Sequence, residues 1–141
     1  MDNNIETHPV ELLLPDGSSI KGQFHIWDWE PEDRNKVRLA LEYTGKTLTR
    51  TEYDYFTAMI EIRRELETDG ILLKCYGASK NVYPSRMALD MGAGWKAYKT
   101  TLGQQAKTSD LVSIFESGPD VEPATVEEQK AFHEAWFDSL G

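Results

Sequence analysis

Residues 10–29 read VELLLPDGSSIKGQFHIWDW, and this stretch decides the fold. Two apolar segments flank Pro15-Asp16-Gly17-Ser18, whose first three residues each favour a tight turn. The pattern predicts two antiparallel strands, over residues 10–14 and 19–29, joined as a β-hairpin. Successive side chains of a strand point to opposite faces of its sheet. In the second strand the two faces are Ile20, Gly22, Phe24 and Ile26 on one side and Lys21, Gln23, His25, Trp27 and Trp29 on the other.

Further strands are predicted where apolar or β-branched runs end at turn residues. A third strand is expected over residues 36–43, before the turn Thr44-Gly45-Lys46. The run that begins at residue 71 is short and apolar, which is typical of an inner strand. The later strands are expected over residues 71–76, 97–102 and 111–115.

Two capping-box patterns predict helix starts, because a threonine and an acidic residue three positions later satisfy each other's free backbone amides. Thr49–Glu52 reads TRTE and precedes a periodic apolar segment, so the first main helix is expected to begin there. Thr125–Glu128 reads TVEE and begins a last helix that runs to Leu140. Between these helices, Ser85 is expected to cap one helical turn through Met91.

The order strands, helix, strands, helix predicts an α+β fold with a mostly antiparallel sheet, two main helices and a single pair of layers. The 141 residues fit one domain that spans 1–141. A chain of this length buries about two-thirds of the surface that its unfolded form exposes, so its core needs neither a disulfide nor a structural metal. The one cysteine, Cys75, accordingly reads as a small core residue.

The formal net charge is −9, with acidic residues concentrated toward both ends and a mildly basic middle over residues 71–118. This distribution argues against non-specific binding of nucleic acid, which requires a positive surface. It favours a basic protein partner or solubility alone. No apolar run approaches the ~20 residues of a membrane span, and the first residues lack the features of a secretory signal. We therefore expect no membrane association and a cytoplasmic location.

Two nucleotide-binding patterns occur, and neither has the context that it requires. Residues 40–47, ALEYTGKT, match a relaxed P-loop but place bulk and a negative charge where flexible backbone must curl round phosphate. Residues 92–97, GAGWKA, match G-x-G-x-x-A without an alternating βαβ pattern. His8, His25 and His133 lack the spacing of zinc ligands. The sequence predicts no catalytic residue, no cofactor and no metal, and an enzyme is the less favoured class.

The end of the predicted hairpin combines large aromatic side chains with carboxylates. Aromatic residues and complementary charge are typical of the centre of a protein-binding surface. We therefore predict a site for a basic protein partner, in which the carboxylates steer the partner and an indole anchors it. The alternative is that a helix or the glycine-rich segment covers both indoles. The predicted partner-binding residues are Trp27, Asp28, Trp29, Glu30, Glu32 and Asp33.

The glycine-rich segment over residues 77–103 carries the second candidate site. Its cations and aromatic rings suit an anionic ligand or a strand of nucleic acid. The alternative is a structured loop whose lysines pair with the acidic remainder of the domain. The candidate ligand-binding residues are Tyr83, Arg86, Trp95, Lys96, Tyr98 and Lys99.

Residues 81–87, NVYPSRM, and 90–98, DMGAGWKAY, resemble a stretch found in small, uncharacterised bacterial proteins. In size and acidity the chain also resembles immunity proteins, which neutralise toxins delivered between competing bacteria. The resemblance is one of type, so it implies no activity and assigns no residue a role. The leading hypothesis is an immunity-type protein that binds and neutralises a cognate bacterial toxin by direct protein–protein contact. The alternative is a binding module or small enzyme for an anionic ligand, built on residues 77–103.

Overall fold

The computed structural model describes residues 5–29 and 32–141. Within them, two sheets and three α-helices form the fold. The strands are β1 (Ile5–Leu13), β2 (Ser19–Trp27), β3 (Val37–Tyr43), β4 (Lys46–Glu52), β5 (Leu72–Lys74), β6 (Val82–Tyr83), β7 (Lys96–Lys99) and β8 (Leu111–Ser113). The helices are α1 (Tyr55–Glu67), α2 (Arg86–Gly92) and α3 (Val126–Ser139), with short 3₁₀ turns η1 (Tyr76–Ala78) and η2 (Thr108–Asp110).

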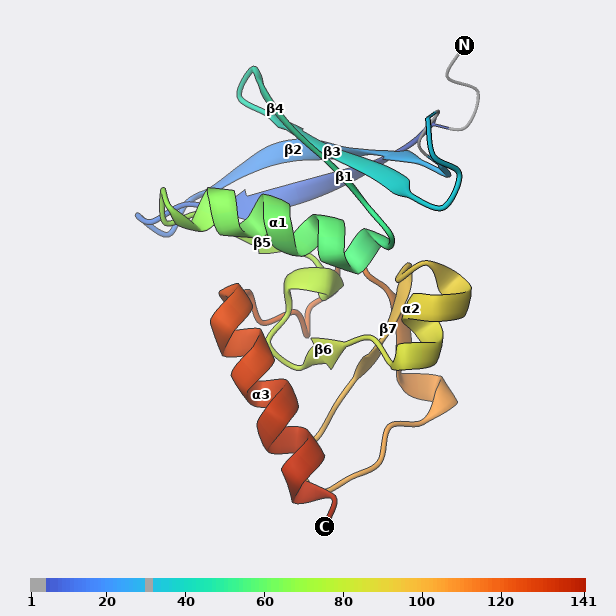
Figure 1. The fold of residues 1–141 in the computed structure, drawn as a ribbon. Helices are drawn as coiled ribbons and strands as arrows, with labels where there is room; N and C mark the ends of the chain where they lie inside the picture. The colour runs from blue at the N-terminus through green and yellow to red at the C-terminus, as the bar shows by residue number, and fades with distance from the viewer. Residues whose placement is uncertain (1–4, 30–31) are drawn as a thin grey trace.

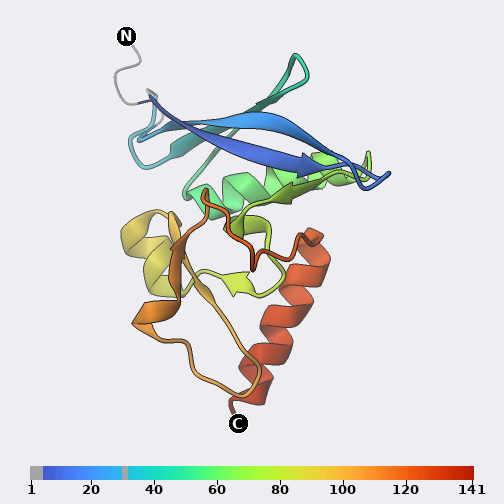
Figure 2. The ribbon, with the colours of Figure 1, turned by 180° about the vertical axis from the view of Figure 1, so that it is seen from behind.

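The larger sheet has the strand order β4-β3-β2-β1-β5, and the smaller sheet has the order β6-β7-β8. Every pairing between these strands is antiparallel. Helix α1 lies against the larger sheet, and the smaller sheet, α2 and α3 lie beyond α1 (Figure 1; Figure 2 shows the reverse side). The predicted α+β class with a mostly antiparallel sheet is confirmed. The prediction of a single pair of layers did not include the smaller, three-stranded sheet.

The predicted hairpin is confirmed as β1 and β2. Leu13 pairs with Ser19, and the two strands stay in register along nine residues each. Asp16 fixes the turn, because its Oδ1 accepts both the backbone N–H of Ser18 at 2.9 Å and the Ser18 hydroxyl at 2.6 Å. These hydrogen bonds lower the pKa of the Asp16 carboxyl. The turn and the alternation together set which face of the sheet is buried.

The predicted helix start at Thr49–Glu52 is wrong, because these residues belong to β4. Thr44 and Gly45 both have positive φ, 45° and 78°, and form the two-residue turn that pairs β3 with β4. Helix α1 begins after Asp54, whose Oδ1 accepts the backbone N–H of Thr57 at 2.6 Å. The tight turn and the three β-branched threonines of this segment favour a strand, and they prevail over the four-residue capping pattern that predicted a helix.

The later strands are shorter than predicted. The run over 71–76 contributes three residues to β5, which is an edge strand beside β1 and not an inner strand as predicted. The predicted strands over 97–102 and 111–115 correspond to β7 and β8. Sequence reasoning missed β6, which has only two residues and no periodicity to detect.

Both later helix starts are confirmed. Ser85 Oγ accepts the backbone N–H of Ala88 at 3.0 Å and caps α2, which has seven residues. Thr125 Oγ1 accepts the backbone N–H of Glu128 at 3.1 Å, and Glu128 Oε1 accepts that of Thr125 at 2.8 Å. This reciprocal capping box begins α3, and its hydrogen bonds lower the pKa of the Glu128 carboxyl.

The main core lies between the larger sheet and α1. Cys75 belongs to it, as predicted, and burial raises the pKa of its thiol to about 11. Close packing of this apolar layer supplies the main driving force for folding. The fully buried side chains from β2, β3 and α1 include Phe24, Ile26, Leu39, Leu41, Met59 and Ile62.

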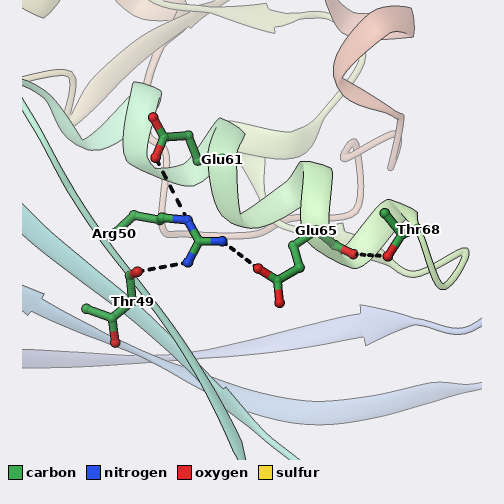
Figure 3. A network of polar contacts seen from close by, with 5 residues as sticks. All are labelled: Thr49, Arg50, Glu61, Glu65 and Thr68. Carbon is green, nitrogen blue, oxygen red and sulfur yellow. Dashed lines mark hydrogen bonds and ion pairs between the residues drawn. The ribbon is translucent and has the colours of Figure 1, made fainter.

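A surface network joins the edge strand β4 to α1 (Figure 3). The Arg50 guanidinium lies 3.9 Å from the Glu61 carboxylate, pairs with Glu65 and donates to the Thr49 carbonyl oxygen at 2.9 Å. A hydrogen bond with the Glu52 carboxyl and partial burial raise the pKa of Glu61 to about 7, although the Arg50 charge opposes that rise. Exposed ion pairs of this kind add little stability, so the network chiefly orients the strand on the helix.

Toward the smaller sheet, α1 presents a buried cation. Arg63 is 2% exposed, and its guanidinium donates to the carbonyl oxygens of Gly77 at 3.2 Å and Ala124 at 3.0 Å. It also donates to Gln129 Oε1, on α3, at 2.6 Å. Within the described residues no carboxylate forms an ion pair with Arg63, so neutral oxygen atoms solvate its charge. Burial accordingly lowers the pKa of Arg63.

Gln129 completes this buried network. Its side chain is 1% exposed, and its Nε2 lies 3.0 Å from the carbonyl oxygens of Gly77 and Ser79 and 2.8 Å from that of Val82. The two side chains together satisfy carbonyl groups of η1, β6 and the segment before α3. Buried polar groups are costly unless they are hydrogen-bonded, so Arg63 and Gln129 dock the smaller sheet and α3 on α1.

We expect Arg63→Met to lower the free energy of unfolding by about 3–5 kcal/mol, because buried carbonyl oxygens lose their donor. The adjacent Arg64 provides a matched control, since its pair with Glu127 at 3.3 Å is exposed. Arg64→Met should cost about 0–1 kcal/mol. Urea unfolding of both variants measures the difference, and equal losses would contradict the assignment of Arg63 as the buried anchor.

Candidate functional site

Trp27, at the end of β2, is half buried by its own domain. Its carbonyl oxygen accepts the Tyr55 hydroxyl at 2.6 Å, and the Arg38 guanidinium lies 5.3 Å from the centre of its indole. Its Nε1 is buried and has no hydrogen-bond partner within the described residues. Burial, with the charges of Asp28 and Glu6, raises the pKa of Tyr55, so that hydroxyl stays protonated and keeps donating. Trp27 therefore contributes to packing more than to open surface.

Trp29 and Tyr53 are exposed aromatic side chains that a cation holds in place. Trp29 is 38% exposed, with the Arg34 guanidinium 5.4 Å from its ring centre. Tyr53 directly precedes the cap of α1, is 66% exposed and has the Lys36 ammonium 5.1 Å from its ring centre. Cation–π contacts at exposed sites are worth about 0.5–1 kcal/mol, enough to restrict the rings before a partner arrives.

The carboxylates predicted to surround the tryptophans differ in their surroundings. Asp28 and Glu32 are exposed to solvent. Asp33 is half buried, and its Oδ1 accepts the backbone N–H of Asn35 at 2.9 Å, so it also stabilises its own loop. Glu30 lies outside the described residues. The cations stacked on the neighbouring rings make this region mixed in charge instead of uniformly acidic.

Helix α2 adds two exposed methionines. Met87 is 69% and Met91 82% exposed, and a separation of four residues places them on one helix face. The Tyr55 N–H donates to the Ala93 carbonyl oxygen at 2.7 Å, which ties the end of α2 to the start of α1. Figures 1 and 2 both show α2 below the end of the larger sheet where β2 finishes and β3 begins. We call Trp29, Tyr53, Met87 and Met91 the aromatic–methionine surface.

Sequence reasoning placed Trp29 in this site but missed Tyr53, Met87 and Met91. The only signal for the methionines was their spacing, which equally suits a buried helix face. Their exposure follows from how α2 docks, because this helix buries none of its residues completely. Large apolar side chains gathered on a surface mark interaction sites, and methionine adapts to partners of irregular shape.

The second predicted set is divided by the structure. Tyr83 and Tyr98 pair across β6 and β7. Trp95 packs edge-on against Tyr55, with ring centres 5.2 Å apart, and the Lys99 ammonium lies 3.1 Å from an Asp120 carboxylate oxygen. The remaining two cations, Arg86 and Lys96, are exposed. The tyrosines therefore come together, whereas one of the three cations is already paired within the chain.

Beside these tyrosines lies a pocket of about 300 Å³ between the smaller sheet and α3. The rings of Tyr83 and His133 stack with centres 3.9 Å apart and planes 9° apart. Trp136 and Tyr98 also line it, and within residues 5–29 and 32–141 no Asp, Glu, Lys or Arg side chain does. Burial lowers the pKa of His133, against a weaker opposite effect of Glu134, so the imidazole adds no charge at neutral pH.

A wider hollow of about 620 Å³ crosses β1, β2 and β3 around Gly22. Its charged side chains are largely paired within the chain. Lys74 Nζ lies 3.3 Å from Glu11 Oε1, and His25 Nε2 lies 2.9 Å from Glu42 Oε1. The Lys74–Glu11 pair presents no single sign of charge to a ligand, and the Glu42 carboxylate is already hydrogen-bonded, so this hollow is a weaker candidate than the two sites above.

Comparisons with known proteins assign no function to either site. No protein family and no curated protein matches this chain. In the described part of the chain, no helix has the length and apolar character needed to cross a membrane. The same residues contain no group of three or more His, Cys, Asp or Glu side chains placed to hold a metal ion.

We expect His133 to make stability depend on pH. Its folded-state pKa is lowered from 6.5, so the unfolded chain takes up the proton first. The stability due to the neutral ring is complete above pH 6.5 and is lost as pH falls toward the folded-state pKa. His133→Gln should show a smaller decline in urea midpoint between about pH 8 and pH 5 than the unsubstituted chain. An equal decline in the two proteins would refute this role.

Proposed function

We propose that this chain is an immunity-type protein that docks on a cognate bacterial toxin and neutralises it by direct contact. The docking site in this proposal is the aromatic–methionine surface. The observation that carries it is the exposure of four large apolar side chains: Tyr53, Met87 and Met91 are each above 60% exposed, and Trp29 is 38% exposed. Removing apolar side chains of this size from water lowers the free energy, so their burial by a partner favours binding.

The charges around this surface favour specific recognition of a partner over non-specific hydrophobic association. Arg34 and Lys36 hold the rings of Trp29 and Tyr53, which lowers the entropy lost when a partner binds. Asp28 and Glu32 stand exposed nearby and suit a polar rim. The net charge of −9 attracts a basic partner at long range, so association should weaken as salt is added.

The toxin candidates for testing are the products of genes that neighbour this one, each produced with the tagged chain. The proposal expects one stoichiometric partner that is toxic when produced alone and harmless with this chain. The double variant Trp29→Ala/Met91→Lys should weaken the complex by at least about tenfold, because it removes an anchor and places a cation before a basic partner.

Phe137→Ala is the matched control, since Phe137 is 67% exposed but belongs to α3, whose C-terminal end points away from the larger sheet (Figure 1). Isothermal titration calorimetry should give this control the affinity of the unsubstituted chain. The proposal fails if the double variant binds and protects as well as the unsubstituted chain. It also fails if every neighbouring gene product is harmless alone or is equally toxic with and without this chain.

A further inference from the structure

The pocket beside α3 is built from aromatic rings of separate elements. Tyr83 comes from β6, Tyr98 from β7, and His133 and Trp136 from α3. His133 stacks on Tyr83, and the Trp136 ring centre lies 5.8 Å from that of His133 with planes 26° apart. These aromatic side chains line the pocket with apolar, polarisable surface, which suits stacked or edge-to-face contact with another flat ring.

The polar groups of the pocket fall into two sets. Trp136 Nε1 donates to the Gln104 carbonyl oxygen at 2.8 Å and is therefore committed to its own chain. The Tyr83 hydroxyl, the Tyr98 hydroxyl and the Gln105 amide, by contrast, form no hydrogen bond within the described residues. These three groups can donate to or accept from a ligand, as the few fixed polar groups of small-molecule sites do.

Charge around the pocket also limits what can bind. Two lysines of the glycine-rich segment contact other groups, because Lys99 pairs with Asp120 at 3.1 Å and the Lys80 ammonium lies 5.9 Å from the ring centre of Phe132. His133 is neutral, and no formally charged side chain in the described residues lines the space. A charged ligand would lose hydration here without gaining a counter-ion.

We propose that this pocket binds an uncharged, planar nitrogen heteroaromatic molecule of one or two rings, in contact with the aromatic side chains that line it. A pocket of about 300 Å³ is at the small end of ligand sites, which suits a molecule of this size. The Tyr98 hydroxyl and the Gln105 amide recognise its ring nitrogens or amide substituent. This site differs from the predicted anionic-ligand site in its charge and in its dependence on α3, and it is separate from the aromatic–methionine surface.

Nicotinamide and nicotinate test the proposal as a matched pair, because they share one ring and differ in the charge of one substituent. Adenine serves as the two-ring probe. Titration followed by ¹H–¹⁵N NMR should show saturable shifts of the Trp136 indole N–H with nicotinamide or adenine. Nicotinate should bind at least about tenfold more weakly, because its carboxylate must be desolvated.

Ala106→Phe should abolish binding by filling the pocket, which Ala106 lines. If that variant does not fold, Tyr98→Phe removes one hydroxyl without adding volume and should weaken nicotinamide binding about threefold or more. Phe137→Ala is the control and should bind as the unsubstituted chain does. The proposal is overturned if nicotinate binds as well as nicotinamide, if binding survives both pocket substitutions, or if none of the three probes gives saturable shifts.

Discussion

The buried guanidinium of Arg63 is the interaction on which the arrangement of this molecule depends. Helix α1 packs its apolar face on the larger sheet and turns Arg63 toward the rest of the chain, where three neutral oxygen atoms accept its hydrogen bonds. Gln129, on α3, extends the network because its side-chain amide donates hydrogen bonds to carbonyl oxygens in and next to η1 and in β6. A charge removed from water requires these partners, so the position of α3 and of the smaller sheet is set by chemistry as well as by shape.

Both candidate sites are consequences of that docking. Tyr55 links the halves a second time, through its hydroxyl to the Trp27 carbonyl and through its N–H to the Ala93 carbonyl. This second link holds α2, with its exposed methionines, below the end of the larger sheet. The aromatic pocket lies further along α3, where His133 meets Tyr83. The proposed protein-docking surface and the proposed ligand pocket share no lining residue.

The sequence predicted those features whose causes are local. The hairpin at residues 10–29 and the helix caps at Ser85 and Thr125 are confirmed, because each depends on turn or capping chemistry within a few residues. The capping pattern at Thr49–Glu52 predicted a helix start wrongly. Threonine is a good strand former, and these residues pair with β3 as the second strand of a hairpin. Only tertiary structure shows which of two adjacent arginines in α1 is buried.

The same division applies to function. The sequence proposed Trp29, Tyr83 and Tyr98 as candidate site residues, whereas the pairing of the two tyrosines and the neutrality of the pocket follow from contacts between distant segments. Hydrogen exchange measured by NMR on Gln129→Leu tests the central claim that the Arg63 network docks the smaller sheet and α3. We predict that amides of β6, β7 and α3 lose protection while β1, β2 and β3 keep theirs. Equal loss throughout the chain, or no loss in α3, would contradict that claim.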